Sequence, residues 1–400
     1  MPDTNHNWTS GLRLIPRSIW AIGFVSMFMD ISSEMIHALL PIYMVSVLGT
    51  SVLAVGIIEG IAEATASITK IFSGALSDWL GKRKLLAVIG YGMAAFTKPV
   101  FPMAQSLDWL IGARFLDRIG KGIRGAPRDA LVAEIAPPEL RGASFGLRQS
   151  LDTTGAFLGP LLAIALMMLS GNNFQFVFWI AVIPAFVALA LMMFAVSEPK
   201  RPVEQKRVRL KFSDAARFPR VYWAIVAVAA VLTLARFSEA FLVLRAQNVG
   251  LAVALIPIVL VVMNVVYALS AYPAGVVADK AGRTGGLIIG IICLILADII
   301  FAYTSSIWGV MAGIALWGLH LGLTQGLFAT LVADTSPADL RGTAFGVFNF
   351  VSGMAMLLAS VVAGGLWDIY GAQATFMFGA VVAGGALAGV AALRMTQTMK

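Results

Sequence analysis

Four basic residues in the first half of this 400-residue chain are spaced so that they lie on one side of a helix. Arg114, Arg118, Lys121 and Arg128 are separated by four, three and seven residues. At ~100° per residue, these separations put the four side chains along one stripe. Arginine suits the bidentate capture of a carboxylate or phosphate, and lysine offers a point charge. The stripe could therefore bind an anion.

Carboxylates in the same half are also spaced by helical turns. Asp30 and Glu34 are four residues apart, and Glu63 and Asp152 each lie one turn after another charged residue. In an apolar cavity, burial disfavours the ionised form of a carboxyl, whereas a nearby arginine favours it. A carboxyl held between these two effects can take up and release protons, and ionisable groups inside a membrane are functional by default. We therefore predict proton exchange at Asp30, Glu34, Glu63 and Asp152.

A structural interpretation of the same charges stays open, because ion pairs lower the cost of burying charge and can be inert. The pairs that the spacing allows are Glu59 or Glu63 with Arg114, Asp30 or Glu34 with Arg118 or Lys121, and Asp152 with Arg148. The alternative is that some polar groups remain available to a ligand. The residues that we expect at such a ligand site are Arg114, Arg118, Lys121, Arg148, His320 and Gln325.

The second half carries fewer charges in its apolar stretches. Arg236 and Glu239 are three residues apart and are expected to pair with each other. His320 and Gln325 could each line a cavity or make an interhelical hydrogen bond. Cys293 is the one cysteine, and the three histidines are scattered. We therefore predict no metal site, no disulfide and no catalytic cluster.

The elements that position these charges must cross a membrane. Hydrophobic residues make up 59% of the chain and charged residues 12%, whereas a soluble domain carries ~25% charged residues. Twelve spans of ~20 residues account for the apolar content, and a soluble fold of this length could not bury it. The composition excludes a cytosolic enzyme, a secreted domain and a disordered chain.

The apolar residues fall into segments without the period of two that a β-barrel requires. We expect an all-α membrane protein whose first six spans lie near 18–47, 52–77, 85–105, 108–130, 143–170 and 174–196. The second six are expected near 221–247, 251–278, 286–304, 307–333, 342–367 and 372–394. The charges of the fourth span would cost on the order of 10 kcal/mol in lipid, so this span must face protein or water.

Lysines and arginines concentrate in the predicted termini and in every second loop. The loop at 197–220 holds eight of them, whereas the alternate loops hold none. By the positive-inside rule, both termini and this loop face the cytoplasm. The same rule explains the net charge of +8 without a nucleic-acid partner. The chain then divides into a terminal segment 1–17, spans in 18–196, a basic linker 197–220, spans in 221–394 and a tail 395–400.

The two halves of the chain are similar in sequence. Residues 131–146 read LVAEIAPPELRGASFG, and residues 331–346 read LVADTSPADLRGTAFG. The glycines, the aspartate and the basic residue of the segment 74–82 recur in 275–283. A repeat at about half the chain length predicts two pseudo-symmetric six-helix bundles around a central cavity, as in secondary transporters.

Two further segments carry a resemblance to a known family. Residues 74–84 read GALSDWLGKRK, and residues 114–120 read RFLDRIG. They resemble the signatures of the major facilitator superfamily (MFS) after span 2 and in span 4, apart from Trp79, Asp117 and Arg118. The resemblance implies the MFS fold and a conformational latch that favours the outward-facing state. The latch residues that it implies are Gly74, Asp78, Gly81, Lys82, Arg83, Arg128 and Asp279.

The fifth span carries most of a glycine motif that this family associates with antiporters. Gly146, Gly155, Gly159 and Pro160 match the motif, whereas its final glycine pair is absent. One interpretation is close helix packing through small residues, with a kink at the proline. The other is a glycine face along which the span slides during the transport cycle. The motif favours antiport.

We predict a proton-coupled secondary transporter that moves a small anionic or zwitterionic organic molecule by alternating access. Export by proton antiport is the first choice, and proton symport of an organic anion into the cell is the alternative. An enzyme would need a clustered nucleophile or metal set, and a channel would need a selectivity ring. The expected partners are the solute, protons and the lipid bilayer, with no cofactor and no nucleic acid. We expect a monomer in a bacterial-type inner (plasma) membrane.

Overall fold

A computed structural model describes residues 14–104, 106–137, 140–198, 217–281, 283–337 and 340–398. Within these ranges all regular secondary structure is helical, which confirms the predicted fold class. Most of the expected N-terminal segment, most of the expected linker and the last two residues lie outside the described part of the chain.

The first half of the chain forms six spans, of which the first and third are interrupted. Span 1 consists of α2 (Arg17–His37), α3 (Leu40–Ile42) and the π-helix η1 (Tyr43–Val47). Span 3 consists of α5 (Arg83–Thr97) and α6 (Val100–Met103). The continuous spans are α4 (Val52–Leu80), α7 (Leu107–Ile135), α8 (Arg141–Leu169) and α9 (Phe174–Phe194).

The second half repeats this plan. Its first span consists of α10 (Arg220–Ala235) and α11 (Ala240–Asn248), with a break at 236–239. Its second span combines the 3₁₀ turn η4 (Val253–Leu255) with α12 (Ile258–Ala281). The remaining spans are α13 (Arg283–Tyr303), α14 (Ile307–Thr335), α15 (Arg341–Tyr370) and α16 (Ala372–Thr398). Helices α7 and α14 have 29 residues each and begin 200 positions apart, as the sequence repeat predicts.

The fourth span differs from the others in its charge. Eleven helical segments of the described residues are long and apolar enough to cross a membrane, and α7 is not among them. Its 29 residues suffice in length, but it carries too many ionised side chains. Arg114 and Arg118 are buried, whereas Trp109 and Phe115 on the same helix are exposed. The charged face of α7 therefore points into the protein, as predicted, and its aromatic face points toward lipid.

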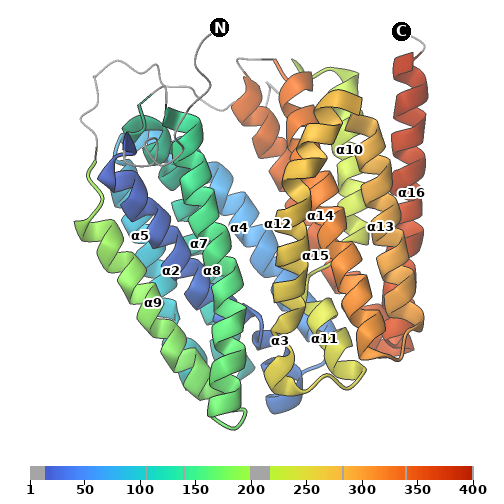
Figure 1. Cartoon of the computed structure of the whole chain (residues 1–400), viewed down its shortest axis with the longest axis horizontal. Coiled ribbons are helices and arrows are strands. Elements are labelled where there is room, and N and C mark those ends of the chain that lie inside the picture. Colours follow the sequence, from blue (N-terminus) through green and yellow to red (C-terminus); the bar gives the residue numbers. More distant parts are fainter. Residues whose placement is uncertain are drawn as a thin grey trace, which may run out of the picture.

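Figure 1 shows the two halves as helical bundles that stand side by side, α2 to α9 in one and α10 to α16 in the other. In the first bundle α2 packs against α8 and α9, and α7 packs against α4 and α5. In the second, α14 packs against α12 and α13, and α16 packs against α13 and α10. Helix α2 begins and α16 ends at the same side of the molecule, which we call the terminal side. The opposite side is called the far side.

Glycines bring the two bundles into backbone contact along α4 and α15. A Cβ atom added to Gly56 would collide with the carbonyl oxygen of Ser360, and one added to Gly60 would lie 3.0 Å from Cα of Leu357. Further toward the far side, a Cβ atom at Gly364 would lie 2.7 Å from Cα of Leu53. Small residues at a helix–helix contact inside a membrane permit this close approach.

The bundles also meet through shorter elements on the far side. Helix α3 contacts α11, and α8 contacts η4. The Nε2 group of Gln247 on α11 donates a hydrogen bond of 2.8 Å to Oγ of Ser46 in η1. The contacts of α3 and η1 with α11 join the ends of the first spans of both halves, and that of α8 with η4 joins the fifth span of the first half to the second span of the second half. The bundles are therefore held together on the far side.

Candidate functional site

A polar cavity lies between the two bundles. Its volume is about 320 Å³, which is near the lower limit for sites that bind small molecules. The first bundle lines it with Glu34, His37, Glu63, Arg118, Lys121 and Ala156. The second bundle lines it with Arg236, Phe237, Ser238, Glu239, Asn264, Trp317, Leu321, Gln325 and Met356. Counted by charge, the lining holds three cations, three carboxylates and one histidine.

The wall formed by α7 contains one paired and one unpaired cation. Arg118 forms an ion pair of 3.2 Å with Glu63 on α4. Lys121, one turn further along α7, is exposed to the cavity and forms no ion pair with any residue that the structure describes. Spacing predicted both residues at this site, and the structure brings both to the cavity. Lys121 is therefore available to an anionic group.

Charged residues connect the cavity to the interior of the first bundle, from Glu34 and His37 in its lining to the buried Glu59. His37 Nδ1 lies 3.6 Å from Oε2 of Glu34, and His37 Nε2 lies 3.7 Å from Oε2 of Glu59. Glu59 is fully buried and accepts a hydrogen bond of 2.6 Å from Arg114. The pairing of Glu59 with Arg114 was among those expected. His37 was not among the residues predicted to exchange protons or to bind the ligand.

The wall of the second bundle is formed where its first span breaks. Helix α10 ends at Ala235 and α11 begins at Ala240, so Arg236 and Glu239 flank a stretch that is not helical. Both residues are described, and neither an ion pair nor a hydrogen bond joins them, so the predicted pair is wrong. The prediction assumed a continuous helix, in which residues three apart share a face. Irregular backbone at this depth is tolerated where it lines a cavity, and broken helices mark solute sites in transporters.

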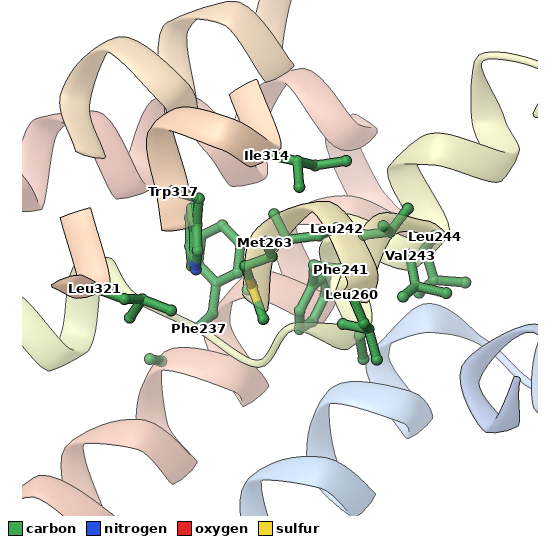
Figure 2. Close-up of a cluster of buried hydrophobic side chains, with 14 of the residues drawn as sticks. Phe237, Phe241, Leu242, Val243, Leu244, Leu260, Met263, Ile314, Trp317 and Leu321 are labelled. Carbon is green, nitrogen blue, oxygen red and sulfur yellow. The ribbon is translucent and has the colours of Figure 1, made fainter. Parts of the chain in front are cut away.

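Aromatic residues support this break. Phe237 lies between Trp317 of α14 and Phe241 of α11, with ring centroids 5.7 Å and 5.2 Å away. Figure 2 shows Phe237 and Trp317 next to each other, with Met263 and Leu321 beside them. Phe237 and Trp317 are both buried. This apolar support fixes the backbone on which Arg236 and Glu239 are presented.

A second cavity adjoins the first. Its volume is about 280 Å³, and it shares Arg236 and Gln325 with the first cavity. Its lining includes Phe328 on α14 and Phe348 on α15, which lie closer to the terminal-side ends of these helices than the residues of the first cavity do. Tyr267 donates a hydrogen bond of 3.2 Å to Gln325 at the junction. The polar space therefore extends toward the terminal side.

Three of the predicted ligand residues do not line either cavity. Arg114 is buried behind Glu59. His320 is fully buried, and its Nδ1 lies 2.9 Å from the carbonyl oxygen of Gly290. Arg148 belongs to a separate cluster nearer the terminal side, where it lies 3.5 Å from Asp152. The predicted proton residue Asp152 belongs to this cluster too, at 3.5 Å from Arg128.

Asp30 and Glu34, the two predicted proton-exchanging residues of α2, differ in position. Glu34 lines the cavity, whereas Asp30 does not, and Asp30 forms no ion pair within the described residues. A Cβ atom added to Gly155 on α8 would lie 3.0 Å from Cβ of Asp30. Asp30 therefore lies at the contact between α2 and α8.

One buried ion pair was not found by sequence analysis. Lys98 Nζ, at the end of α5, lies 2.9 Å from Asp117 of α7 and donates a hydrogen bond of 3.1 Å to Ser33 of α2. Lys98 and Asp117 are both buried. This pair joins three helices directly behind the cavity wall.

The predicted latch residues lie at the terminal-side end of α4 and its surroundings. Gly81 has a φ of 67° and ends α4 in the left-handed conformation that favours glycine. A Cβ atom at Gly74 would lie 3.4 Å from Cβ of Ala126 on α7. Lys82 is exposed, and Arg83 forms an ion pair of 3.2 Å with Glu134. The side chains of Asp78 and Asp279 lie outside the described part of the structure.

The span-5 motif lies at a contact within one bundle. Added Cβ atoms at Gly155 and Gly159 would collide with Met27 and Glu34 of α2, whereas one at Gly146 would meet nothing within 4 Å. Pro160 lies inside α8, which continues through it to Leu169. Gly155 and Gly159 therefore pack closely against α2, which both the packing and the sliding interpretation allow.

Comparison with known proteins agrees with this geometry. The model of the Major Facilitator Superfamily matches residues 22–245 and 237–398. An uncharacterised MFS-type transporter of Methanocaldococcus jannaschii is 35% identical over 379 residues, covering 93% of each chain. The inner membrane transport protein YajR of Escherichia coli is 25% identical over 390 residues, covering 92% of this chain and 81% of its own.

Solved structures show the same fold. The crystal structure of a mutant of the nucleoside transporter NupG has a TM-score of 0.78 at 14% identity, covering 94% of this chain and 99% of that chain. The human organic anion transporter MFSD10 has a TM-score of 0.68 at 16% identity, covering 94% of this chain and 99% of that chain. The chain, with its two six-span bundles around a polar cavity, belongs to the major facilitator superfamily and is a secondary transporter.

Proposed function

We propose that this protein couples protons to the movement of a small zwitterionic or anionic organic molecule by alternating access. The observation that carries this proposal is the set of unpaired charges in the cavity. Lys121, Arg236 and Glu239 line it from both bundles, and none of them has an ion-pair partner among the described residues. Unpaired ions inside a membrane protein are costly, so they are retained where a ligand or water compensates them.

The balance of charges favours a zwitterion. Cations and carboxylates are equal in number in the lining. A solute with no net charge therefore binds in the cavity without leaving an excess of positive or negative charge. Its anionic group binds to Lys121 and Arg236, and its cationic group binds to Glu239 or Glu34. Arg236 contributes fork geometry, which suits a carboxylate or phosphate.

Glu34 and Glu63 are the proton-exchanging carboxylates of this proposal. Both line the cavity, so protons reach them through water, whereas Asp30 and Asp152 lie behind it. The cluster of Arg128, Arg148 and Asp152 is assigned to the conformational change instead, because it lies at the terminal-side end of α7 and α8.

The positive-inside rule puts the terminal side in the cytoplasm of a bacterial-type inner membrane. Contacts of α3, η1 and α8 join the bundles on the far side, whereas α4 and α15 stay in contact past their midpoints, as between Gly353 and Ser67. Because the second cavity extends toward the terminal side, we assign the conformation as inward-facing. The latch around Asp78 acts in the opposite, outward-facing state.

The charge of the solute decides the direction of coupling. The ammonium group of a zwitterion competes with a proton for Glu34, which gives antiport and export, in agreement with the span-5 motif. An anion has no such group. It binds best when a proton has added one positive charge to the balanced cavity, which gives symport and import. Antiport of a zwitterion is our first choice, and symport of an anion is the second candidate.

Transport assays in proteoliposomes with an imposed pH gradient test the proposal. We would compare amino acids and other zwitterions, organic anions and organic cations, each with and without the gradient. Accumulation of a zwitterion against the proton gradient supports antiport, and accumulation of an anion with the gradient supports symport. Transport of cations only, or transport indifferent to the gradient, would contradict the proposal.

A further inference from the structure

We infer that His37 holds the coupling proton, which enters from the cavity through Glu34. This inference rests on the proton coupling proposed above and assigns it to a side chain. The carboxylates considered so far explain how a proton reaches the site but not where it stays. His37 lies between the cavity-facing Glu34 and the sealed Glu59, at 3.6 Å and 3.7 Å.

The two carboxylates approach different nitrogens of the imidazole ring. Glu34 faces Nδ1 and Glu59 faces Nε2. A neutral imidazole has one N–H donor, so it can serve only one carboxylate at a time, whereas the imidazolium has two. The site is therefore built for the protonated ring. Histidine is also the side chain that ordinarily changes its charge between pH 5 and 8.

The proposed path of the proton follows the decrease in exposure from Glu34 to Glu59, with His37 itself also at the cavity. Side-chain exposure is 24% for Glu34, 14% for His37 and 0% for Glu59. A proton taken up from cavity water by a Glu34 oxygen passes to Nδ1 of His37, which leaves Glu34 ionised and the ring charged. Both distances exceed that of a hydrogen bond, so the transfer uses a small side-chain rotation or one bridging water. Release reverses these steps.

The charges around His37 set the environment of its neutral and its protonated form. On α4, Glu59 and Glu63 face the ring region, and on α7, Arg114 and Arg118 pair with them. Because each of these arginines is matched by a carboxylate, His37 is the described residue that forms an ion pair with Glu34. Lys121 of α7 and Asp30 of α2 also interact electrostatically with Glu34, but without an ion pair. Across the cavity lie Arg236 and Glu239.

This arrangement gives His37 a direct link to solute binding. When the ring is charged, its partner Glu34 is occupied. When the ring is neutral, Glu34 is free to bind the cationic group of a solute. The Oε1 atom of Glu59 is buried without a hydrogen-bond partner in the described part of the chain, so Glu59 can turn toward the ring without breaking its contact to Arg114. Glu59 is a positioning residue in this account.

The test uses His37→Gln in the full-length protein, with two readouts in proteoliposomes. The first is solute accumulation driven by a pH gradient, and the second is solute exchange with equal pH on both sides. We expect His37→Gln to lose gradient-driven accumulation and to retain exchange. Glu34→Gln should lose both, because Glu34 also binds the solute. His320→Gln, which alters another buried histidine, should retain both.

Several results would overturn the inference. Gradient-driven accumulation by His37→Gln at the wild-type level contradicts it, and so does an equal loss of accumulation and exchange in both His37→Gln and His37→Asn. Proton release on solute addition to purified protein, followed with a pH indicator, gives an independent readout, which should vanish in His37→Gln. If the wild-type protein itself ignores the gradient, the proposed function fails rather than this assignment.

Discussion

Asp368 of the second bundle caps the helix that begins at Val52 in the first bundle. Its carboxylate accepts hydrogen bonds from the backbone amides of Val52, at 3.1 Å, and Leu53, at 2.9 Å. Asp368 lies near the C-terminal end of α15, where a negative charge opposes the helix dipole, and at the N-terminal end of α4, where it complements the dipole. Asp368 therefore stabilises a helix of the other bundle, and we expect this contact to break when the far side opens.

We predict that Asp368→Ala shifts the protein toward the state that is open on the far side. Replacing an N-cap side chain by alanine costs about 1 kcal/mol, which changes the ratio of two states by about fivefold. Reactivity of single cysteines on the far side with an impermeant thiol reagent measures this ratio. Asp108→Ala, which removes an exposed carboxylate in the first turn of α7, is the control and should leave the ratio unchanged. An unchanged ratio in both variants would show that Asp368 does not hold the closed side.

Arg236 and Glu239 should contribute to the binding of different parts of the solute. Removing a hydrogen bond to a charged group costs about 1.5–3 kcal/mol. Arg236→Gln should therefore weaken the binding of a zwitterion about 10- to 100-fold. Glu239→Gln should weaken the zwitterion but not its analogue without the amine. Equilibrium binding of both compounds to the purified variants measures this, with Arg220→Gln, at the exposed start of α10, as control. Equal losses for both compounds in Glu239→Gln would contradict the assignment.

Gly155 and Gly146 lie on one helix but should differ in their tolerance of a methyl group. Gly155→Ala forces a Cβ atom against the backbone of Met27, and overpacking of this kind costs about 1–3 kcal/mol. Gly146→Ala meets open space and should be neutral. Thermal unfolding in detergent together with the transport rate separates the two effects. If Gly155→Ala slows transport while the unfolding temperature is unchanged, the result supports the sliding interpretation of the glycine face rather than the packing interpretation.

Lys98 and Asp117 should behave as a structural pair. Breaking a buried pair leaves an uncompensated charge and costs about 3–5 kcal/mol, so Lys98→Met should lower the unfolding temperature strongly. The double variant Lys98→Met with Asp117→Leu should recover part of this loss. Because neither residue lines the cavity, the double variant should still bind the solute. A double variant that is stable but unable to bind would assign the pair to the site instead.

The periodicity of charges predicted which helix faces the cavity but not how far each charge is from it. Arg114, Arg118 and Lys121 share a face of α7, yet only Arg118 and Lys121 reach the cavity. The distance of each side chain from the cavity depends on how α7 packs against α4, where Glu59 pairs with Arg114. Spacing along one helix does not contain this information. The pair between Lys98 and Asp117 was missed for the same reason, since it joins two helices.

The break at 236–239 could not be predicted from the local sequence. The segment reads RFSE and lacks the proline or glycine that usually interrupts a helix. Its non-helical backbone is stabilised by tertiary contacts instead, among them the hydrogen bond of 3.2 Å from the amide of Ser238 to Oγ of Ser360. The repeat, by contrast, predicted the two bundles well, because sequence similarity at an offset of 200 residues needs no knowledge of packing.

Accessibility of the cavity from each side tests the account most directly. Asn264 lines the cavity, and Asn264→Cys in a background with Cys293→Ala gives one reactive thiol. In oriented vesicles, we predict modification by an impermeant reagent from the terminal side in the resting protein. Transport conditions should add modification from the far side, and bound solute should protect the thiol from both. A thiol that reacts from neither side, or that the transported solute never protects, would contradict a shared cavity with alternating access.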